Sequence, residues 1–451
     1  MSPTPEGGLT EEERRPLIDN EGRALLSKLL EDPRAPRYNH TCGDRLTTAG
    51  LARVRAFEQE TAARTGWAQG RPPAWVAGFA SRVSTQVPAY RRAGALPARF
   101  NQIPTVSRAD LVRDPYGFVP DDHPLDDMVV YTTTGTGGTG VAYIASTPEA
   151  AASYCVLLGA ALGLHGLALE GGPGRTAVAQ VCWQRSTYTY ASVSSFLDQG
   201  ATCKLNLSPA DWRAPGDPEA FLEAIAPEVL TGDPVAFARL ASLDVDLQPK
   251  ALLSSAMALL PGLRAELETR FGCPVIDVYG MNESGPIAAG LPDGSGHGLL
   301  QPGLYVEILD PAGRSCPPGE RGEITLTGGF NPALPLLRYR TGDFAALDWR
   351  GGLPVLVGLE GRAPVHFAAA DGRAVNTIDV SVALGRFPLA RFSVHQAADR
   401  SLTVGLDGSG RAADPGVREV LGELFGEVPV TVVDLAGAEE AVSYSSELTG
   451  G

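Results

Sequence analysis

The sequence predicts an α/β protein with two domains. We expect a large N-terminal domain over residues 1–360, built on parallel and mixed sheets with an antiparallel subdomain, and a small, mobile α+β domain over residues 361–451. The chain has 451 residues and 44% hydrophobic content, enough for more than one core. From 128 to about 290, short apolar runs alternate with helical stretches, which is typical of βαβ units. From 303 to 358 the runs become short alternating strands.

The N-terminal part is predicted to be helical. Residues 9–35 and 48–65 carry charged, helix-forming sequence, with two prolines at 33 and 36 between them. A loop over 101–106 then leads into a further helix. Ser107 is its expected N-cap, and Asp110 stands at the third helical position, where it completes a capping box.

The central part contains the apolar runs of the predicted parallel sheet. A helix is expected over 261–271, and the apolar stretch 154–169 is too short to span a bilayer and indicates a buried helix. The expected strands are 128–131, 176–181, 201–205, 229–230, 251–253 and 275–279.

The C-terminal part of the sequence shows a different pattern of predicted strands and helices. Antiparallel strands are predicted at 304–309, 322–327 and 353–357. After 361, strands are expected at 392–395, 402–406 and 428–433, with a helix at 414–425.

The net charge and the cysteine pattern argue against several kinds of binding partner and of cysteine site. A net charge of −15 and a pI of about 4.9 argue against nucleic acid and anionic membranes as partners. The six cysteines form no CxxC pair, which indicates neither a disulfide framework nor a zinc knuckle. The first 15 residues lack the apolar segment of a signal peptide. A cytoplasmic protein is therefore expected.

A loop rich in threonine and glycine at 131–140 is the first candidate binding site. Glycines let backbone N–H groups approach phosphate oxygens, and threonine hydroxyls add donors or bind a metal ion. A plain surface turn explains the same composition. The candidate nucleotide-binding residues here are Thr133, Thr134, Gly135, Thr136, Gly137 and Gly138.

Three further segments follow in order. Residues 279–285 read Tyr-Gly-Met-Asn-Glu-Ser-Gly, and residues 337–343 read Leu-Arg-Tyr-Arg-Thr-Gly-Asp, with the aspartate expected after a tight turn. Gly361-Arg362 precedes the last domain. Together with the Thr/Gly loop, this order resembles the adenylate-forming superfamily. The segments 103–111 and 317–326 are most similar to its phenylacetate–CoA ligase branch.

The resemblance implies ATP and Mg²⁺ as cofactors and a role for each matched residue. Thr134, Thr136 and the glycines would hold the phosphates, and Glu283 would bind Mg²⁺, so Glu283 and Thr136 are the expected catalytic residues. Tyr279 would stack on adenine, near Asp277 and Gly280, and Asp343 would accept both ribose hydroxyls. The structural alternatives are a turn cap for Asp343, a core aromatic for Tyr279 and a solvated loop charge for Glu283.

The segment 183–197 corresponds, by the same resemblance, to the lining of the substrate pocket. Trp183, Tyr188 and Tyr190 are the candidate substrate-binding residues for a small aromatic molecule. A half-buried helix face explains the same pattern.

The chain also departs from the family. Its lysines are Lys28, Lys204 and Lys250, so the C-terminal catalytic lysine of the family has no counterpart. Loss of such a cation costs about 2.7–4 kcal/mol in the transition state. Arg362 or Arg373 is the expected substitute. A proline at 364 near the hinge makes the use of CoA doubtful.

Three functions fit these observations. The first is an adenylate-forming ligase for a small, aromatic carboxylic acid. The second is an ATP-dependent diazotase that adenylates nitrite and passes the nitroso group to an arylamine, a route that needs neither CoA nor domain rotation. The third is a catalytically degenerate member. The resemblance also suggests a homodimer.

Overall fold

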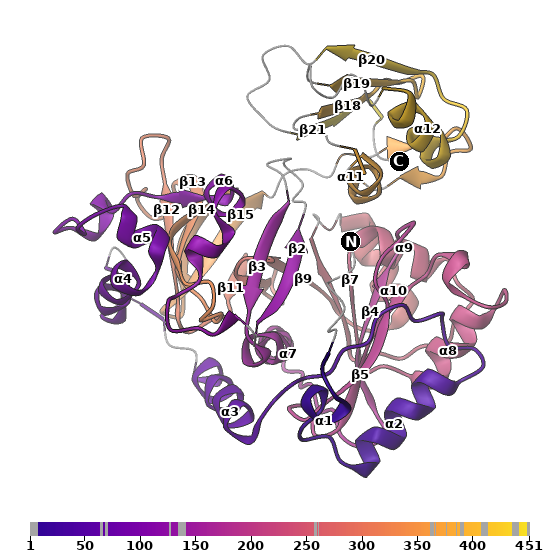
Figure 1. The fold of residues 1–451 in the computed structure, drawn as a ribbon, viewed down its shortest axis with the longest axis horizontal. Coiled ribbons are helices and arrows are strands. Elements are labelled where there is room, and N and C mark those ends of the chain that lie inside the picture. Colours follow the sequence, from indigo (N-terminus) through magenta and orange to yellow (C-terminus); the bar gives the residue numbers. More distant parts are fainter. Residues whose placement is uncertain are drawn as a thin grey trace.

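The computed structural model describes residues 8–448 except for 64–65, 68–70, 126–127, 134–140, 257–258, 260, 361–364, 366, 376, 385, 388–391, 407–413 and 435–441. Figure 1 shows a large body and a smaller C-terminal body above it. Within the described part of the chain, no helix combines the length and apolar character needed to cross a bilayer.

The parallel sheet predicted for the central region is confirmed. The strands β4, β6, β7, β8 and β9 are parallel in the order β9-β8-β7-β4-β6, and β5 closes the edge as an antiparallel strand. Their bounds are β4 Thr176–Cys182, β5 Tyr190–Ser194, β6 Gly200–Asn206, β7 Val229–Gly232, β8 Ala251–Ser255 and β9 Val275–Met281.

Helices cover both faces of this sheet. Alternate strand residues, such as Leu230 and Leu252, point into a core shared with α8, α9 and α10. Their neighbours Val229 and Leu253 point into a second core with α7. This two-sided burial explains why the strands read as continuous apolar runs. The helices are α7 Pro148–Leu164, α8 Asp217–Ile225, α9 Pro234–Ala241 and α10 Pro261–Phe271.

The run at 128–131 is a strand but does not join the parallel sheet. It forms β2 (Val129–Thr133), which pairs antiparallel with β3 (Ala142–Ser146) in a hairpin of its own. The alternating pattern of β3 gives it one buried face, at Ala142, Ile144 and Ser146. The expectation that this run belongs to the βαβ series is therefore wrong.

The predicted antiparallel region is confirmed, but it continues the main sheet. The order runs β12-β13-β14-β15-β11-β10-β9, so β10 and β11 join it to the parallel part. The bounds are β10 Gly285–Gly290, β11 His297–Leu299, β12 Leu304–Leu309, β13 Arg321–Gly328, β14 Leu336–Arg350 and β15 Leu353–Glu360.

The tight turn expected before Asp343 is a bulge inside β14. The pairing with β13 shifts between Glu323 and Thr325, and Gly342 adopts a φ of +81° that favours glycine. The backbone N–H of Gly342 donates to Glu323 Oε1 over 3.1 Å. Because the strand continues through the bulge, Asp343 is held on a rigid element.

The N-terminal helices and the capping box are confirmed. Ser107 and Asp110 make the reciprocal bonds of a capping box at the start of α6. Two residues before this helix form β1 (Val106–Ser107), which pairs parallel with β14. The helices are α1 Glu11–Arg14, α2 Asn20–Glu31, α3 Thr48–Ala62, α4 Trp75–Gln86, α5 Pro88–Arg92 and α6 Arg108–Arg113.

The small C-terminal body has its own sheet, in the order β20-β19-β18-β21, and its own core. The predicted strands and helix are present, while α11 and β21 were not predicted. The predicted boundary at 360/361 adjoins residues outside the described ranges and stays a prediction. The bounds are β16 Phe367–Ala368, β17 Ala374–Val375, α11 Thr377–Leu384, β18 Phe392–Gln396, β19 Leu402–Leu406, α12 Asp414–Phe425, β20 Val430–Asp434 and β21 Val442–Ser446.

Candidate active site

The structure brings Tyr279 and Asp343 together from two distant strands. Tyr279 lies near the end of β9, and its hydroxyl donates to Asp343 Oδ2 on β14 over 2.9 Å. Burial, with Asp343 nearby, raises the pKa of Tyr279 well above its usual value, so the hydroxyl stays a proton donor. Tyr279 also packs against a hydrophobic core cluster. This packing agrees with the core-aromatic alternative, and the adenine-stacking role stays a prediction.

Glu283 lies in the turn between β9 and β10 and is only 5% exposed. Its Oε1 accepts from Arg108 Nη1 over 2.6 Å and from the hydroxyl of Tyr339 over 3.3 Å. The alternative of a solvated loop charge is wrong. A buried carboxylate beside a cation and a neutral hydroxyl can hold a metal ion or a proton at a fixed place.

The position of Arg108, the first residue of α6, is fixed by the segment that precedes this helix. Arg338, on β14, donates through Nη1 to the carbonyls of Asn101 and Ile103 over 2.9 Å and 2.7 Å. Together with the pairing of β1 along Tyr339, these bonds fix the entry of α6. The sequence analysis missed Arg108 and Tyr339 as site residues, although both stand inside the segments that carried the resemblance.

Asp277 and Gly280, the residues predicted to lie near Tyr279, make different contacts. Asp277 stands two residues earlier on the same strand face, and its Oδ2 lies 3.0 Å from Nε2 of His297. Gly280 lies where a Cβ atom would come within 2.7 Å of the carbonyl oxygen of Gly285. A side chain would push the two strands apart at the point where Glu283 is presented.

The segment 183–197 is a loop followed by β5, so the helix alternative is wrong. The rings of Tyr188 and Tyr190 stack with centroids 6.1 Å apart, and His40 stands edge-on to both. Trp183 lies elsewhere, against the core that α9 covers, with the guanidinium of Arg239 4.9 Å from its ring. The structure therefore unites the two tyrosines and separates them from the tryptophan.

Part of the predicted site falls outside the described residues. This holds for Thr134, Gly135, Thr136, Gly137, Gly138 and Arg362, and for the side chain of Thr133. Arg373 is described, and its Nη2 donates to the carbonyl of Leu424 at the end of α12, over 2.7 Å. It is engaged within the small body.

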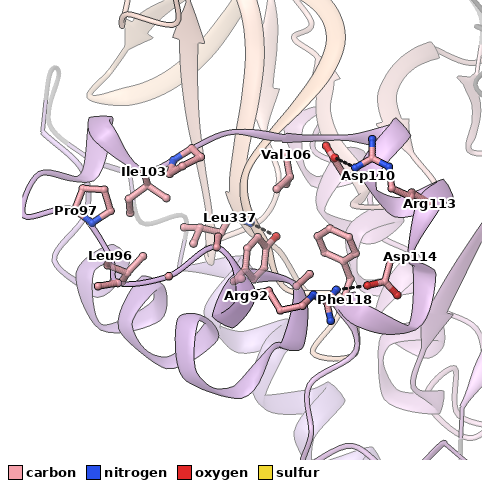
Figure 2. Close-up of a pocket in the computed structure, with 16 residues that line it drawn as sticks. Arg92, Leu96, Pro97, Ile103, Val106, Asp110, Arg113, Asp114, Phe118 and Leu337 are labelled. Atoms are coloured by element: carbon pink, nitrogen blue, oxygen red, sulfur yellow. Dashed lines mark hydrogen bonds and ion pairs between the residues drawn. The ribbon is translucent and has the colours of Figure 1, made fainter.

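A cavity of about 330 Å³ lies elsewhere, between α5, residues 93–104 and α6. Figure 2 shows its apolar lining, which includes Leu96, Ile103 and Phe118. Two ion pairs, Arg92–Asp114 and Arg113–Asp110, border it. None of the candidate catalytic, nucleotide-binding or substrate-binding residues predicted from the sequence is among the residues that line this cavity.

The chain matches a known family over a segment that spans part of this site. Residues 172–331, which include Tyr279 and Glu283, match the AMP-binding enzyme family. Over these residues the chain is similar to that family. The resemblance to the adenylate-forming superfamily is thereby confirmed.

Curated relatives are similar to the chain over short segments. The phenylacetate–coenzyme A ligase of Pseudomonas putida is 37% identical over 89 residues, which cover 19% of this chain and 20% of that one. The medium/long-chain-fatty-acid–CoA ligase of Mycobacterium marinum is 30% identical over 143 residues, 29% of this chain and 27% of that one. The alignment thus spans about a fifth of the first relative's length.

A solved structure extends the likeness in fold. The structure of 2-hydroxyisobutyryl-CoA ligase with 2-HIB-AMP and CoA, in the thioesterification state, covers 88% of this chain and 89% of that chain. Its TM-score is 0.51 and its sequence identity 18%. The predicted fold class, a large mixed α/β body with a small C-terminal α+β body, is confirmed by this match.

The carboxylates allow a test of whether Mg²⁺ fits. Among the described residues, no group of three or more histidines, cysteines or acidic residues could hold an ion by itself. Mg²⁺ is usually bound through one or two carboxylates plus substrate phosphates and waters. A single buried carboxylate, Glu283, therefore fits a nucleotide-bound Mg²⁺ and not a metal held by protein alone.

Proposed function

We propose that this chain is an AMP-forming ligase that binds ATP with Mg²⁺ and transfers AMP to a small aromatic carboxylic acid. The observation that carries the proposal is the convergence of Tyr279, Glu283 and Asp343. They come from a strand, a turn and a distant strand, and the fold gathers them beside Arg108 and Tyr339. The match of residues 172–331 to the AMP-binding enzyme family supports the same reaction class.

The reaction asks for positioning and charge stabilisation more than for covalent work by the protein. A carboxylate oxygen of the acid forms a bond to the α-phosphorus, and the bond from that phosphorus to pyrophosphate breaks. In the proposed arrangement, the ring of Tyr279 supports adenine and Asp343 accepts the ribose hydroxyls. By the family resemblance, Thr134 and Thr136 of the Thr/Gly loop are assigned to binding the phosphates.

Glu283 is the residue we assign to Mg²⁺. When bound, the ion neutralises charge on the phosphates and on the departing pyrophosphate. In the structure, Glu283 Oε1 accepts from Arg108. Arg108 thus stands beside the metal position, where it can hold the carboxylate in place before nucleotide arrives.

A second candidate function is activation of nitrite. The observation that favours it is the absence of any lysine after Lys250, which removes the family's C-terminal cation. A nitrite oxygen would form the bond to the α-phosphorus with loss of pyrophosphate. An arylamine nitrogen would then bond to the nitroso nitrogen as AMP leaves, and loss of water would give the diazonium. This reading needs no CoA.

Replacement of Glu283 by Gln tests the proposal. Gln keeps an acceptor for Arg108 and Tyr339 but loses the charge that a metal needs. We expect ATP-dependent AMP release to fall at least about 100-fold, as for loss of a preorganised electrostatic group, while the fold is kept. Glu320→Gln, an exposed control, should leave turnover unchanged. Full turnover in Glu283→Gln, measured by AMP release, would remove Glu283 from the mechanism.

The same AMP-release assay separates the two candidate substrates. The arms are a set of aryl carboxylates with and without CoA, and nitrite with an arylamine. Stimulation by a carboxylate supports the ligase, and a diazonium product supports the second candidate. If ATP with Mg²⁺ shows no binding in calorimetry, both are wrong.

A further inference from the structure

The three lysines of the chain occupy different environments. Lys28 is exposed on α2. Lys250 lies 3.0 Å from Glu170 and 3.0 Å from Glu228, in two ion pairs. Lys204, on β6, is 7% exposed. Within the described ranges, no carboxylate lies at ion-pair distance from its ammonium group.

The ammonium group of Lys204 contacts an aromatic ring. Its Nζ lies 3.4 Å from the centroid of the Tyr188 ring. Lys204 stands directly opposite Tyr190 in the pairing of β5 with β6, so both side chains leave the same face of the sheet. The ammonium group therefore lies over one ring of an aromatic cluster, in which Tyr188 also contacts Tyr190 and His40.

Such an environment is unusual for a lysine. Burial of a charged group is costly unless an opposite charge or hydrogen bonds compensate for the lost water. A ring face compensates for only part of this cost. The ammonium group also has three N–H donors, and a ring face does not provide a conventional hydrogen-bond acceptor for them. An anion beside Lys204 would supply what the protein does not.

The position of Lys204 in the sheet indicates which kind of anion it would bind. Three strands, β4, β7 and β8, lie between β6 and β9. At about 4.8 Å a step, the backbones of Lys204 and Tyr279 are roughly 19 Å apart. Lys204 is therefore remote from the proposed adenine position. It lies instead beside the loop 183–189, which the family likeness assigns to the substrate. Tyr188 and Tyr190 are only partly buried, which leaves the cluster reachable.

We propose that Lys204 binds a carboxylate on the end of the aromatic substrate that is remote from the atom receiving AMP. Tyr188, Tyr190 and His40 contact the ring of that substrate. The inference rests on the proposed function and specifies its substrate class: an aromatic compound with a reacting group at one end and a carboxylate at the other. Lys204 is thus a residue that sets specificity rather than one that acts on the phosphate.

The test compares charged and neutral members of two probe pairs by calorimetry. The pairs are terephthalate against benzoate, and 4-aminobenzoate against aniline. We expect the wild-type protein to bind the member with the added carboxylate about 10- to 100-fold more tightly, as for a hydrogen bond between charged groups. Lys204→Met keeps the apolar stem and should reduce this preference to less than about twofold. Lys204→Arg should retain most of it.

Controls separate this inference from the proposed function. ATP affinity, titrated in the same variants, should not change, and Lys28→Met should behave as wild type in every arm. If ATP fails to bind but the probe preference depends on Lys204, the proposed function is wrong and the anion site stands. Equal affinity of the wild type for both members of each pair overturns the anion site, and this result does not require any variant to fold. A preference that persists in Lys204→Met overturns it as well.

Discussion

At the scale of single residues, the site combines two carboxylates with two tyrosine hydroxyls. Asp343 receives a hydrogen bond from Tyr279, and Glu283 receives one from Tyr339. Burial, more than any other cause, raises the pKa of Tyr279 and of Tyr339 well above the usual value, so both hydroxyls remain neutral donors across the physiological range. The two carboxylates thus each accept a hydrogen bond from a neutral hydroxyl that orients them.

The dual role proposed for Tyr279 gives a prediction with a matched pair of variants. Tyr279→Phe removes the hydroxyl that orients Asp343 but keeps the ring, so ATP affinity should change by less than about threefold. Tyr279→Ala also removes the ring, and loss of base stacking costs about 1–3 kcal/mol, or roughly 5- to 150-fold in affinity. Titration of ATP into both proteins measures this. Equal losses in the two variants would show that the ring does not contact adenine.

The sequence predicted some of these residues and not others for a physical reason. Glu283 and Asp343 stand in short segments whose order is diagnostic, so they could be found without a structure. Lys204 could only be counted as one of three lysines. Its place beside Tyr190, with no carboxylate of the described residues at ion-pair distance, depends on how β5 and β6 pair, and no local sequence pattern shows this pairing.

At the scale of elements, β14 organises the site. It contributes Arg338, Tyr339 and Asp343, and its pairing with β1 holds the segment that leads to Arg108. The sequence analysis did not predict this strand. Gly342 and Asp343 interrupt its apolar alternation, and the signal is that of a turn, whereas tertiary pairing with β13 and β15 carries the strand through the bulge.

Among the site residues of β14, we expect replacement of Arg338 to lower the free energy of unfolding most. It pairs with Glu307 over 3.1 Å, and both side chains are 3% exposed. Burial raises the pKa of Glu307 while Arg338 opposes that rise. Arg338→Ala would leave this carboxylate buried and alone, and we expect the free energy of unfolding to fall by about 3–5 kcal/mol.

Urea unfolding provides the measurement and a control for Arg338. Arg314→Ala breaks the exposed pair with Asp310 and should cost less than about 1 kcal/mol. The double replacement Arg338→Met with Glu307→Leu should be less destabilising than Arg338→Ala, because no lone charge remains. A loss below about 1 kcal/mol in Arg338→Ala would mean that water reaches Glu307.

At the scale of the whole molecule, the small C-terminal body touches the predicted substrate loop. The backbone N–H of Arg185 donates to Asp379 Oδ1 on α11 over 3.1 Å, and its Nη2 lies 2.7 Å from Glu423 on α12. Arg185 lies between Trp183 and Tyr188 in the sequence. A movement of the small body would therefore change the contacts of this loop. The contact could not be predicted, because α11 was absent from the sequence analysis.

The contact between the two bodies should depend on pH through Asp379. Burial raises its pKa from 3.8 to about 6, although Arg185 and Arg373 act in the opposite direction and Asp233 adds to the rise. The docked form therefore holds a proton more tightly than a form with Asp379 in water. Docking is favoured as pH falls from about 6 toward 4, and the cost of the buried charge is fully present above pH 6.

We therefore expect the equilibrium toward the docked form to increase about tenfold between pH 7 and pH 5. Small-angle scattering, which reports the fraction of compact molecules, measures it. Asp379→Asn keeps an oxygen for the N–H of Arg185 and removes the titration, so its docking should be insensitive to pH over this range and at least as strong at pH 7. Glu419→Gln, an exposed change on α12, should follow the wild type. Docking of the wild type that weakens on acidification would mean that the charged form of Asp379 holds the two bodies together through Arg185.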